Sequence, residues 1–390
     1  MRLDGVRVLD LTRYLPGPYT TQLLADAGAE VVKIEDTATG DPARWMSFES
    51  EGSDGTLFEA VNRGKRSVAL DLKSDAGREA FFELASDADV LIEGFRPGVT
   101  ERLGVDDDSV REHNPGIVYC SLSGYGQTGP YRTRAGHDLN YAAFSGLLDM
   151  TRADESATPQ IPGVPVGDMA GGLFAAFSIV GALCSRALGN TGGEYLDIAM
   201  TDVLLSFSQA LAPDALAGET PRPGETALTG ELPWYGIYET SDGKFVSIAA
   251  LEPPFWKEFC ETVGREDLVE THMTDDEATR AALREELTEL FAARTRDEWA
   301  EMFADSDATI EPVRTLPEAL DHPQTDSRGL IERTQWPQRI GFPARSSDHA
   351  DPAAGVPGHG TQTEAVLREA GYTDRDIVEL RESEAAVFGE

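Results

Sequence analysis

The sequence is short of lysine and short of positive charge overall. Its 390 residues include 69 acidic and 33 basic side chains, which leaves a formal net charge of −36. Five basic residues are lysines (Lys33, Lys65, Lys73, Lys244 and Lys257) and 28 are arginines. A surface this negative repels phosphate backbones and anionic lipids, which argues against nucleic-acid and membrane partners. An acid-rich, lysine-poor chain fits a salt-rich cytoplasm and predicts a halophilic protein, the alternative being an acidic mesophilic one.

Cysteine is also scarce. Cys120, Cys184 and Cys260 lie far apart and are odd in number, so no disulfide framework is expected. No CxxC or HxxxH spacing accompanies them, which argues against a zinc site. The N-terminal residues alternate like a strand and lack the apolar core of a signal peptide. The apolar stretch 171–188 is closely flanked by polar residues and is marginal as a membrane span. These features predict a soluble, cytoplasmic protein.

Apolar and β-branched runs alternate with helical patterns through the first 200 residues. Strands are predicted at 6–11, 30–34, 67–72, 90–93, 117–121 and 194–200, and helices at 19–27, 76–86, 99–103 and 169–186. This alternation predicts an α/β fold in which helices cover a parallel sheet.

The composition changes at 211–230, where Pro, Gly and Thr predict a connector. Beyond it, runs at 236–240 and 245–249 flank Asp242–Gly243 and predict a hairpin. Acidic helices are expected at 254–263, 279–293 and 296–304, which would make a second, smaller α+β unit. Residues 335–360 are expected to be loop, and short helices at 363–370 and 373–381 close the chain.

Three glycines have the spacing of a dinucleotide-binding fingerprint. Gly124, Gly126 and Gly129 form G-x-G-x-x-G after the strand expected at 117–121. That fingerprint needs a helix to begin over the glycines, so that its N-terminus faces a pyrophosphate. Pro130 and a polar run follow instead, which favours a glycine-rich loop at an active site and argues against NAD binding.

Two polar residues precede predicted helices and are candidates for chemistry. His137 lies between the glycine loop and a helix expected near Leu139, where it could be a general base or an N-terminal cap shared with Asp138. Asp168 precedes the Ala/Gly-rich helix at 169–186, where it could be a plain N-cap. Alternatively it is a functional carboxylate, with neighbouring glycines that let a ligand approach the backbone. The spacing alone does not choose between these alternatives.

Glu252 follows the strand expected at 245–249. It could cap the helix that Pro253 or Pro254 begins, or it could project from the strand end into a cleft between domains.

Segments spread over nearly the whole chain carry a family pattern. They are Val8 to Leu11, Pro16-Gly17-Pro18, Asn62 to Ser67, Leu70 to Lys73, Leu91 to Gly98 and Ser123 to Pro130. On these segments the chain resembles the family III CoA-transferase superfamily. Gly136-His137-Asp138 with Asn140-Tyr141, and Leu251-Glu252-Pro253, are narrower, and they make the chain most similar to the α-methylacyl-CoA racemases.

The resemblance implies a Rossmann-like large domain and a smaller α+β domain in an interlocked homodimer. Expected limits are 1–210 for the large domain, 211–230 for the connector and 231–334 for the small domain, with 335–390 returning to complete the large domain. The acyl-CoA substrate would lie between the large domain of one subunit and the small domain of the other.

The resemblance also implies the chemistry. Inverting C2 of a 2-methylacyl thioester requires one group to remove a proton and another to return one on the opposite face of a planar enolate. As in the racemases, His137 backed by Glu252 would serve one face and Asp168 the other. Backbone N–H groups at the helix start that holds Asp168 are expected to stabilise the enolate oxygen. No metal or redox cofactor is expected, since CoA is part of the substrate.

The CoA contacts of the family carry over to two segments and two arginines. They are Leu70, Asp71, Leu72, Lys73, Gly136, Asp138, Leu139, Asn140 and Tyr141, with Arg96 and Arg102 near the phosphates. Racemases often place Arg-Pro after the second strand, whereas this chain has Glu35-Asp36-Thr37 there. This difference concerns the contacts to the adenosine end of CoA.

Two other functions are compatible with the same residues. A CoA-transferase would use Asp168 as a nucleophile and would form a mixed anhydride and then an enzyme thioester, without needing His137 or Glu252. A CoA-binding subunit that has lost activity is the third possibility. Apolar residues expected near the acyl group favour a branched chain; they are Phe144, Leu147, Met150, Met169 and Tyr235.

Overall fold

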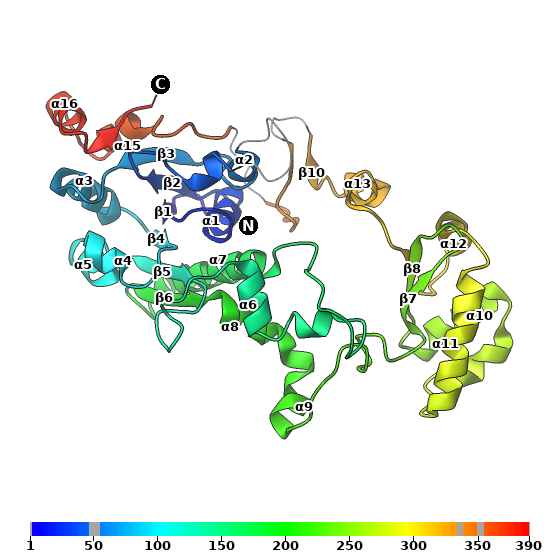
Figure 1. Cartoon of the computed structure of the whole chain (residues 1–390). Coiled ribbons are helices and arrows are strands. Elements are labelled where there is room, and N and C mark those ends of the chain that lie inside the picture. The colour runs from blue at the N-terminus through cyan, green and yellow to red at the C-terminus, as the bar shows by residue number, and fades with distance from the viewer. Residues whose placement is uncertain (1, 47–54, 334–337, 349–354, 390) are drawn as a thin grey trace. The chain divides into compact units, whose positions relative to one another are not determined.

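The computed structural model describes residues 2–46, 55–333, 338–348 and 355–389. The chain forms two units (Figure 1), of which the first contains residues 1–147, 162–208 and 329–390. The second contains residues 148–161 and 209–328. Each unit has its own sheet and its own buried core.

A seven-stranded sheet of order β12-β3-β2-β1-β4-β5-β6 lies at the centre of the first unit. Its strands are β1 (Arg7–Leu11), β2 (Glu30–Glu35), β3 (Arg66–Leu70), β4 (Val90–Glu93), β5 (Val118–Ser123), β6 (Glu194–Ala199) and β12 (Ala386–Val387). Strands β1 to β6 are parallel, and β12 pairs antiparallel with the edge strand β3. The order 3-2-1-4-5-6 is that of a doubly wound α/β fold, so the predicted α/β class is confirmed.

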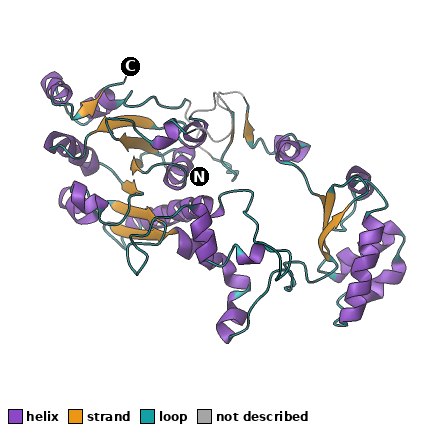
Figure 2. Ribbon diagram, viewed as in Figure 1, coloured by secondary structure: helices purple, strands orange, loops and turns teal. Residues whose placement is uncertain are grey.

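Helices cover both faces of this sheet (Figure 2). On one face, Leu9 and Leu11 join a core cluster with α3 (Asp75–Ser86), α5 (Asp107–His113), α15 (Thr363–Glu369) and α16 (Asp374–Glu382). Side chains alternate along a strand, so Asp10 faces the other way, toward α1 (Pro16–Asp26). Helix α7 (Val166–Ala187) packs against α1, β5, β6 and α8 (Met200–Ser206). Shorter elements of this unit are α2 (Thr56–Val61), α4 (Val99–Leu103), α6 (Asp138–Phe144), β10 (Ile331–Glu332) and β11 (Arg339–Ile340).

Helix α7 is, among the described residues, the one helix long and apolar enough to span a membrane, with a mean hydropathy of 1.6. Half of it is buried inside the first unit. A Cβ on Gly171 would lie 2.5 Å from Met200 Cγ, and one on Gly172 would lie 2.6 Å from the carbonyl of Pro16. The glycines therefore let α7 pack closely against α8 and α1. The interpretation that they admit a ligand is wrong, because protein atoms fill this space.

The second unit is built on the predicted hairpin, which is confirmed. Strands β7 (Tyr235–Glu239) and β8 (Phe245–Ala249) pair antiparallel, and Gly243 takes a φ of 71° in the turn. The further elements are β9 (Ile310–Pro312), α9 (Ala212–Ala217), α10 (Pro253–Val263), α11 (Glu277–Phe291), α12 (Arg296–Met302), α13 (Leu316–Leu320) and α14 (Pro323–Ser327). Its core is rich in aromatic residues, among them Trp234, Trp256, Phe291 and Trp299.

Several element bounds differ from those predicted. Helix α1 begins at Pro16 rather than at residue 19, because proline fits the first helical turn, where its missing N–H costs nothing. Strand β3 ends at Leu70 rather than at residue 72, since Asp71 begins a turn that leads to Ser74, the N-cap of α3. The expected connector contains helix α9, which has a proline in its first turn.

The limits of the units also differ from the expected domain limits. Residues 148–161 belong with the second unit, where Glu155 forms an ion pair with Arg222. Residues 329–333 belong with the first, where Glu332 binds Arg63 (2.7 Å) and Arg339 (2.9 Å).

Candidate active site

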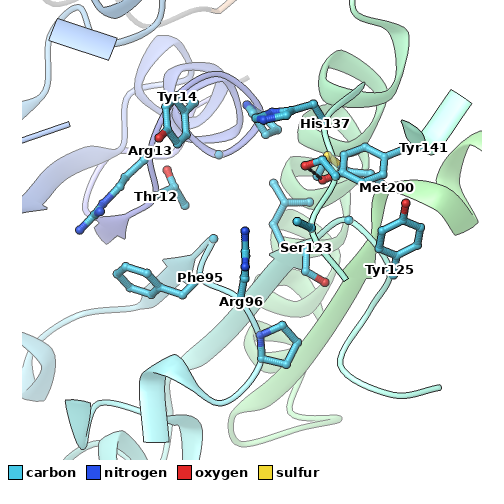
Figure 3. A pocket seen from close by; sticks show the side chains of 18 of the residues that line it. Thr12, Arg13, Tyr14, Phe95, Arg96, Ser123, Tyr125, His137, Tyr141 and Met200 are labelled. Carbon is cyan, nitrogen blue, oxygen red and sulfur yellow. Dashed lines mark hydrogen bonds between the residues drawn. The ribbon is translucent and has the colours of Figure 1, made fainter. Parts of the chain in front are cut away.

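A pocket of about 640 Å³ lies in the first unit, at the carboxyl ends of β1, β4 and β5 (Figure 3). Its walls are the loops that follow these strands, residues 11–17, 94–99 and 122–125, with parts of 132–141, Asp168 of α7 and Met200 of α8. Ligands of doubly wound sheets bind at the carboxyl ends of the strands, where the strand order reverses. In this sheet the order reverses between β1 and β4, so the pocket lies where the fold favours a ligand.

Two buried lysines hold the loop after β1 at both of its ends. Lys33 Nζ donates to the carbonyl of Thr12 (2.8 Å). Lys65 Nζ donates to the carbonyl of Pro18 (2.9 Å) and forms an ion pair with Asp10 (3.1 Å). Burial opposes the ionised form of Asp10, but Lys33 and Lys65 outweigh it and keep the pKa of Asp10 below its usual range. Burial lowers the pKa of Lys65 to about 8, so the ammonium form still predominates at neutral pH.

The middle of this loop is strained. Tyr14 lines the pocket and has a φ of 67°, in the left-handed backbone region that residues other than glycine rarely adopt. Its N–H donates to Asp41 Oδ1 (3.1 Å), and Asp41 forms a buried ion pair with Lys33 (3.0 Å). The buried network therefore fixes the strained residue as well as the ends of the loop.

The pocket is rich in arginine. Among the described residues that line it, four are arginines (Arg13, Arg96, Arg132 and Arg134) and one, Asp168, is an acid. This local excess of positive charge contrasts with the net charge of −36 of the chain and suits a ligand with several anionic groups. Arg96 extends from the loop after β4 into the pocket (Figure 3). The sequence pointed to Arg96 but not to the other three, since arginines in loops follow no periodic pattern.

His137 occupies the N-cap position of α6, as one alternative expected, and its side chain also lines the pocket. The backbone N–H of His137 donates to Asn140 Oδ1 (3.0 Å). Tyr141 Oη donates to the carbonyl of Gly136 (2.6 Å), which holds the residue before His137. Burial, aided by the charge of Asp168, raises the pKa of Tyr141 to about 12, so this phenol stays a neutral donor.

Asp168 is the third residue of α7 rather than its N-cap, so the plain-cap alternative is wrong. The N-cap position belongs to Pro165, which has no side-chain donor or acceptor. Burial, followed by the nearby charge of Asp138, raises the pKa of Asp168 from 3.8 to about 7. A carboxyl group with this pKa can accept or donate a proton near neutral pH.

Three of the backbone N–H groups at the start of α7, where an enolate oxygen is expected to bind, are already bonded. Those of Gly167 and Asp168 donate to Asp138 Oδ1 (2.6 and 3.1 Å), and that of Met169 donates to the carbonyl of Pro165 (3.0 Å). These three N–H groups therefore already have acceptors, and an oxyanion site at this helix start stays a prediction.

The glycine-rich loop is confirmed as a loop. No helix forms between Gly124 and Ala135, and α6 begins at Asp138. A Cβ on Gly124 would lie 2.4 Å from the ring of Tyr141, so this glycine makes room for a wall of the pocket.

Other residues singled out by the sequence lie outside the pocket lining. Leu70 is buried in the core of the sheet, and Asp71 to Lys73 form the turn before α3. Arg102 is exposed on α4, and Leu139 is partly exposed on α6. None of the five residues suggested for the acyl group lines the pocket; its apolar walls include Leu11, Phe95, Leu122 and Met200 instead. Glu252 is exposed in the second unit, at the N-cap position of α10, as one alternative expected.

Comparisons with known proteins agree on the family. The family model for CoA-transferase family III matches residues 3–363. The chain is 36% identical to an α-methylacyl-CoA racemase of Mus musculus, over 97% of this chain and 96% of the relative. It is also 36% identical to a succinyl-CoA:mesaconate CoA-transferase of Haloarcula hispanica, over 86% of each chain. A solved CAIB/BAIF family protein from Brucella suis superposes with a TM-score of 0.80 at 30% identity, over 94% of this chain and 99% of that one.

Proposed function

The chain belongs to CoA-transferase family III, and we propose that it is a CoA-thioester racemase or epimerase that inverts C2 of a 2-methylacyl-CoA. One observation carries the proposal: His137 and Asp168 line the same pocket, and the pKa of Asp168 is raised to about 7. Two-base inversion needs one group that is ready to accept a proton while another is ready to donate one. The imidazole of His137 and a carboxyl group whose pKa is raised to about 7, that of Asp168, meet that need together.

The proposed reaction proceeds through an enolate. In one direction, His137 removes the C2 proton, and the electrons of the C–H bond move into the thioester to form the enolate. Protonated Asp168 then gives its proton to C2 on the opposite face, and the enolate electrons form the new C–H bond. The reverse direction exchanges the two roles. The positive field of the pocket arginines stabilises the negative charge of the enolate.

The arginines also support an acyl-CoA substrate. A guanidinium binds phosphate oxygens through paired hydrogen bonds, and Arg96, Arg132 and Arg134 line the pocket. We assign the CoA phosphates to this group, with Arg102, residues 70–73, Gly136 and residues 139–141 as further contacts. The substrate brings CoA itself, and the proposal requires no metal or redox cofactor.

An exposed apolar face supports a homodimer. One face of α7 exposes Leu173 (51%), Phe177 (73%) and Val180 (39%). Leu205 in α8 and Phe207, which directly follows α8, are also more than half exposed. Apolar side chains gathered in this way favour burial against another protein surface. We propose that a second copy covers them and that Glu252 of one subunit supports His137 of the other. We also propose that the enzyme is cytoplasmic and halophilic and that it acts in lipid metabolism.

A CoA-transferase is the second candidate, favoured by the 36% identity to the Haloarcula hispanica transferase. In that reaction ionised Asp168 would attack the thioester carbonyl, and CoA would leave as the thiolate. This mechanism needs the carboxylate but leaves His137 without a role in the chemistry.

The experiment that separates them uses a single isomer of 2-methylacyl-CoA and no acceptor acid. The racemase should convert it into the mixture of both C2 isomers, measured by chiral chromatography, and His137→Ala should slow this by about 10²–10⁴-fold. Absence of inversion, together with CoA transfer to an added acid and an acyl group trapped on Asp168 by hydroxylamine, would establish the transferase instead.

A further inference from the structure

The carboxylate of Asp138 connects the starts of two helices. Asp138 is the first residue of α6 and follows His137 directly. Its Oδ1 accepts hydrogen bonds from the N–H groups of Gly167 (2.6 Å) and Asp168 (3.1 Å), both in the first turn of α7. The carboxylate of Asp138 therefore binds the backbone of Asp168, and Asp138 is itself the chain neighbour of His137.

The start of α7 lacks a cap of its own and leaves space for Asp138 Oδ1. Helix α7 has Pro165 at its N-cap and no capping side chain of its own, so Asp138 supplies the cap from another segment. A Cβ on Gly167 would lie 3.0 Å from Asp138 Oδ1 and 3.1 Å from Leu204 Cδ1, so glycine leaves the space that the carboxylate occupies. The hydrogen bond between His137 N–H and Asn140 holds the start of α6 in turn.

We infer that Asp138 is a positioning residue that joins the starts of α6 and α7 and so fixes the separation of His137 and Asp168. This inference rests on the proposed function, in which these two residues act on opposite faces of one carbon. A proton transfer depends steeply on distance, and a misplacement of about 1 Å can reduce a rate about 10²-fold. A rigid connection between the two helix starts is what a two-base reaction requires.

The negative charge of Asp138 has a second effect on the same site. It lies close enough to Asp168 to favour the protonated carboxyl. The other charged or titratable groups that line the pocket are three tyrosines, a histidine and four arginines: Tyr14, Tyr125, Tyr141, His137, Arg13, Arg96, Arg132 and Arg134. Removing the charge of Asp138 while keeping its oxygen should therefore shift the titration of Asp168 toward acid without moving the helices.

Two substitutions separate position from charge. Asp138→Asn keeps an oxygen that can accept from Gly167 and Asp168, whereas Asp138→Ala removes both the acceptor and the charge. Asp202→Ala, an exposed acid in the first turn of α8, is the matched control. We expect Asp138→Ala to lower kcat by about 10²-fold. CoA affinity measured by calorimetry should stay within about twofold of wild type, since lost positioning leaves the phosphate contacts in place.

The two variants should also differ in their pH profiles. Asp138→Asn should keep most of kcat, with the limb that reports Asp168 moved toward lower pH. A loss in Asp138→Ala that is confined to KM and CoA affinity would overturn the inference and make Asp138 a CoA contact. Wild-type kcat in Asp138→Ala would overturn it as well.

A readout without turnover keeps this test separate from the proposed function. Hydrogen–deuterium exchange of the segment 162–170 should be faster in Asp138→Ala than in wild type, because the N–H groups of Gly167 and Asp168 lose their acceptor. Asp138→Asn and Asp202→Ala should exchange like wild type. If wild type fails to invert C2 while this exchange pattern holds, the proposed function fails and the connection between the helices stands. Unchanged exchange in Asp138→Ala refutes the connection itself.

Discussion

Asp168→Asn should stabilise the folded chain at pH 8 more than at pH 5, although it removes a proposed catalytic group. The pKa of Asp168 is raised from 3.8 to about 7, chiefly by burial. Between these two values the folded chain keeps a proton that the unfolded chain has lost. Wild type therefore loses stability as the pH rises through this window, whereas the asparagine variant has no such proton to lose.

The size of the effect follows from the two pKa values. Relative to a group with the same pKa in both states, the raised pKa of Asp168 costs the folded state at most about 4 kcal/mol at pH 8 and at most about 2 kcal/mol at pH 5. The stability of Asp168→Asn relative to wild type should thus rise by about 2–3 kcal/mol between pH 5 and pH 8. For a unit of this size, that corresponds to a relative gain of about 4–8 °C in Tm.

Scanning calorimetry of the ligand-free protein at both pH values, in the same salt, measures this difference. Because the comparison is made between two pH values, the constant cost of burying an amide cancels. Asp4→Asn is the control, since Arg2 lowers the pKa of Asp4 to about 2 and the group is ionised in both states throughout. A Tm difference between Asp168→Asn and wild type that is the same at pH 5 and pH 8 would refute the raised pKa.

Three further predictions concern stability and assembly. Lys65→Met should destabilise the chain by about 3–5 kcal/mol in urea unfolding, because it leaves Asp10 buried without its partner. Adding Asp10→Asn should recover part of this loss. A cost below about 1 kcal/mol for Lys65→Met would show that the pair does not hold the loop. Co-expressed Glu252→Gln and Asp168→Ala chains should regain partial activity as heterodimers, whereas confirmed heterodimers without activity would place each site within one chain. Lowering the salt from about 1 M to about 0.1 M lengthens screening from about 3 to about 10 Å and should lower Tm, while a salt-independent Tm would contradict a halophilic protein.

The sequence predicted the central sheet well because its signal is local. Short continuous apolar runs such as that at Val90–Glu93 indicate buried strands, and the structure has a strand at the same residues. The hairpin turn at Asp242–Gly243 was found for the same reason, since its chemistry lies in neighbouring residues.

The walls of the pocket were harder to predict because they depend on contacts between distant segments. Lysine is usually exposed, and nothing local shows that Lys33 and Lys65 are buried beneath the loop after β1. The cap that Asp138 provides joins residues 29 and 30 positions apart, which the sequence cannot reveal. His137 and Asp168 were candidates from their positions before predicted helices, and the family pattern supplied their roles. Only the structure places both in one pocket, where the pKa of Asp168 is raised to about 7.

The exchange of the C2 hydrogen of a 2-methylacyl-CoA tests the central claim most directly. The enzyme is incubated with this thioester in D2O without any acceptor acid, and the C2 proton is followed by NMR. Removal and return of a proton by His137 and Asp168 predict that deuterium replaces the C2 hydrogen and that substituting either residue slows the replacement. A C2 proton that persists in the presence of active wild-type enzyme, while CoA moves to an added carboxylic acid, would contradict proton transfer at C2 and with it the racemase.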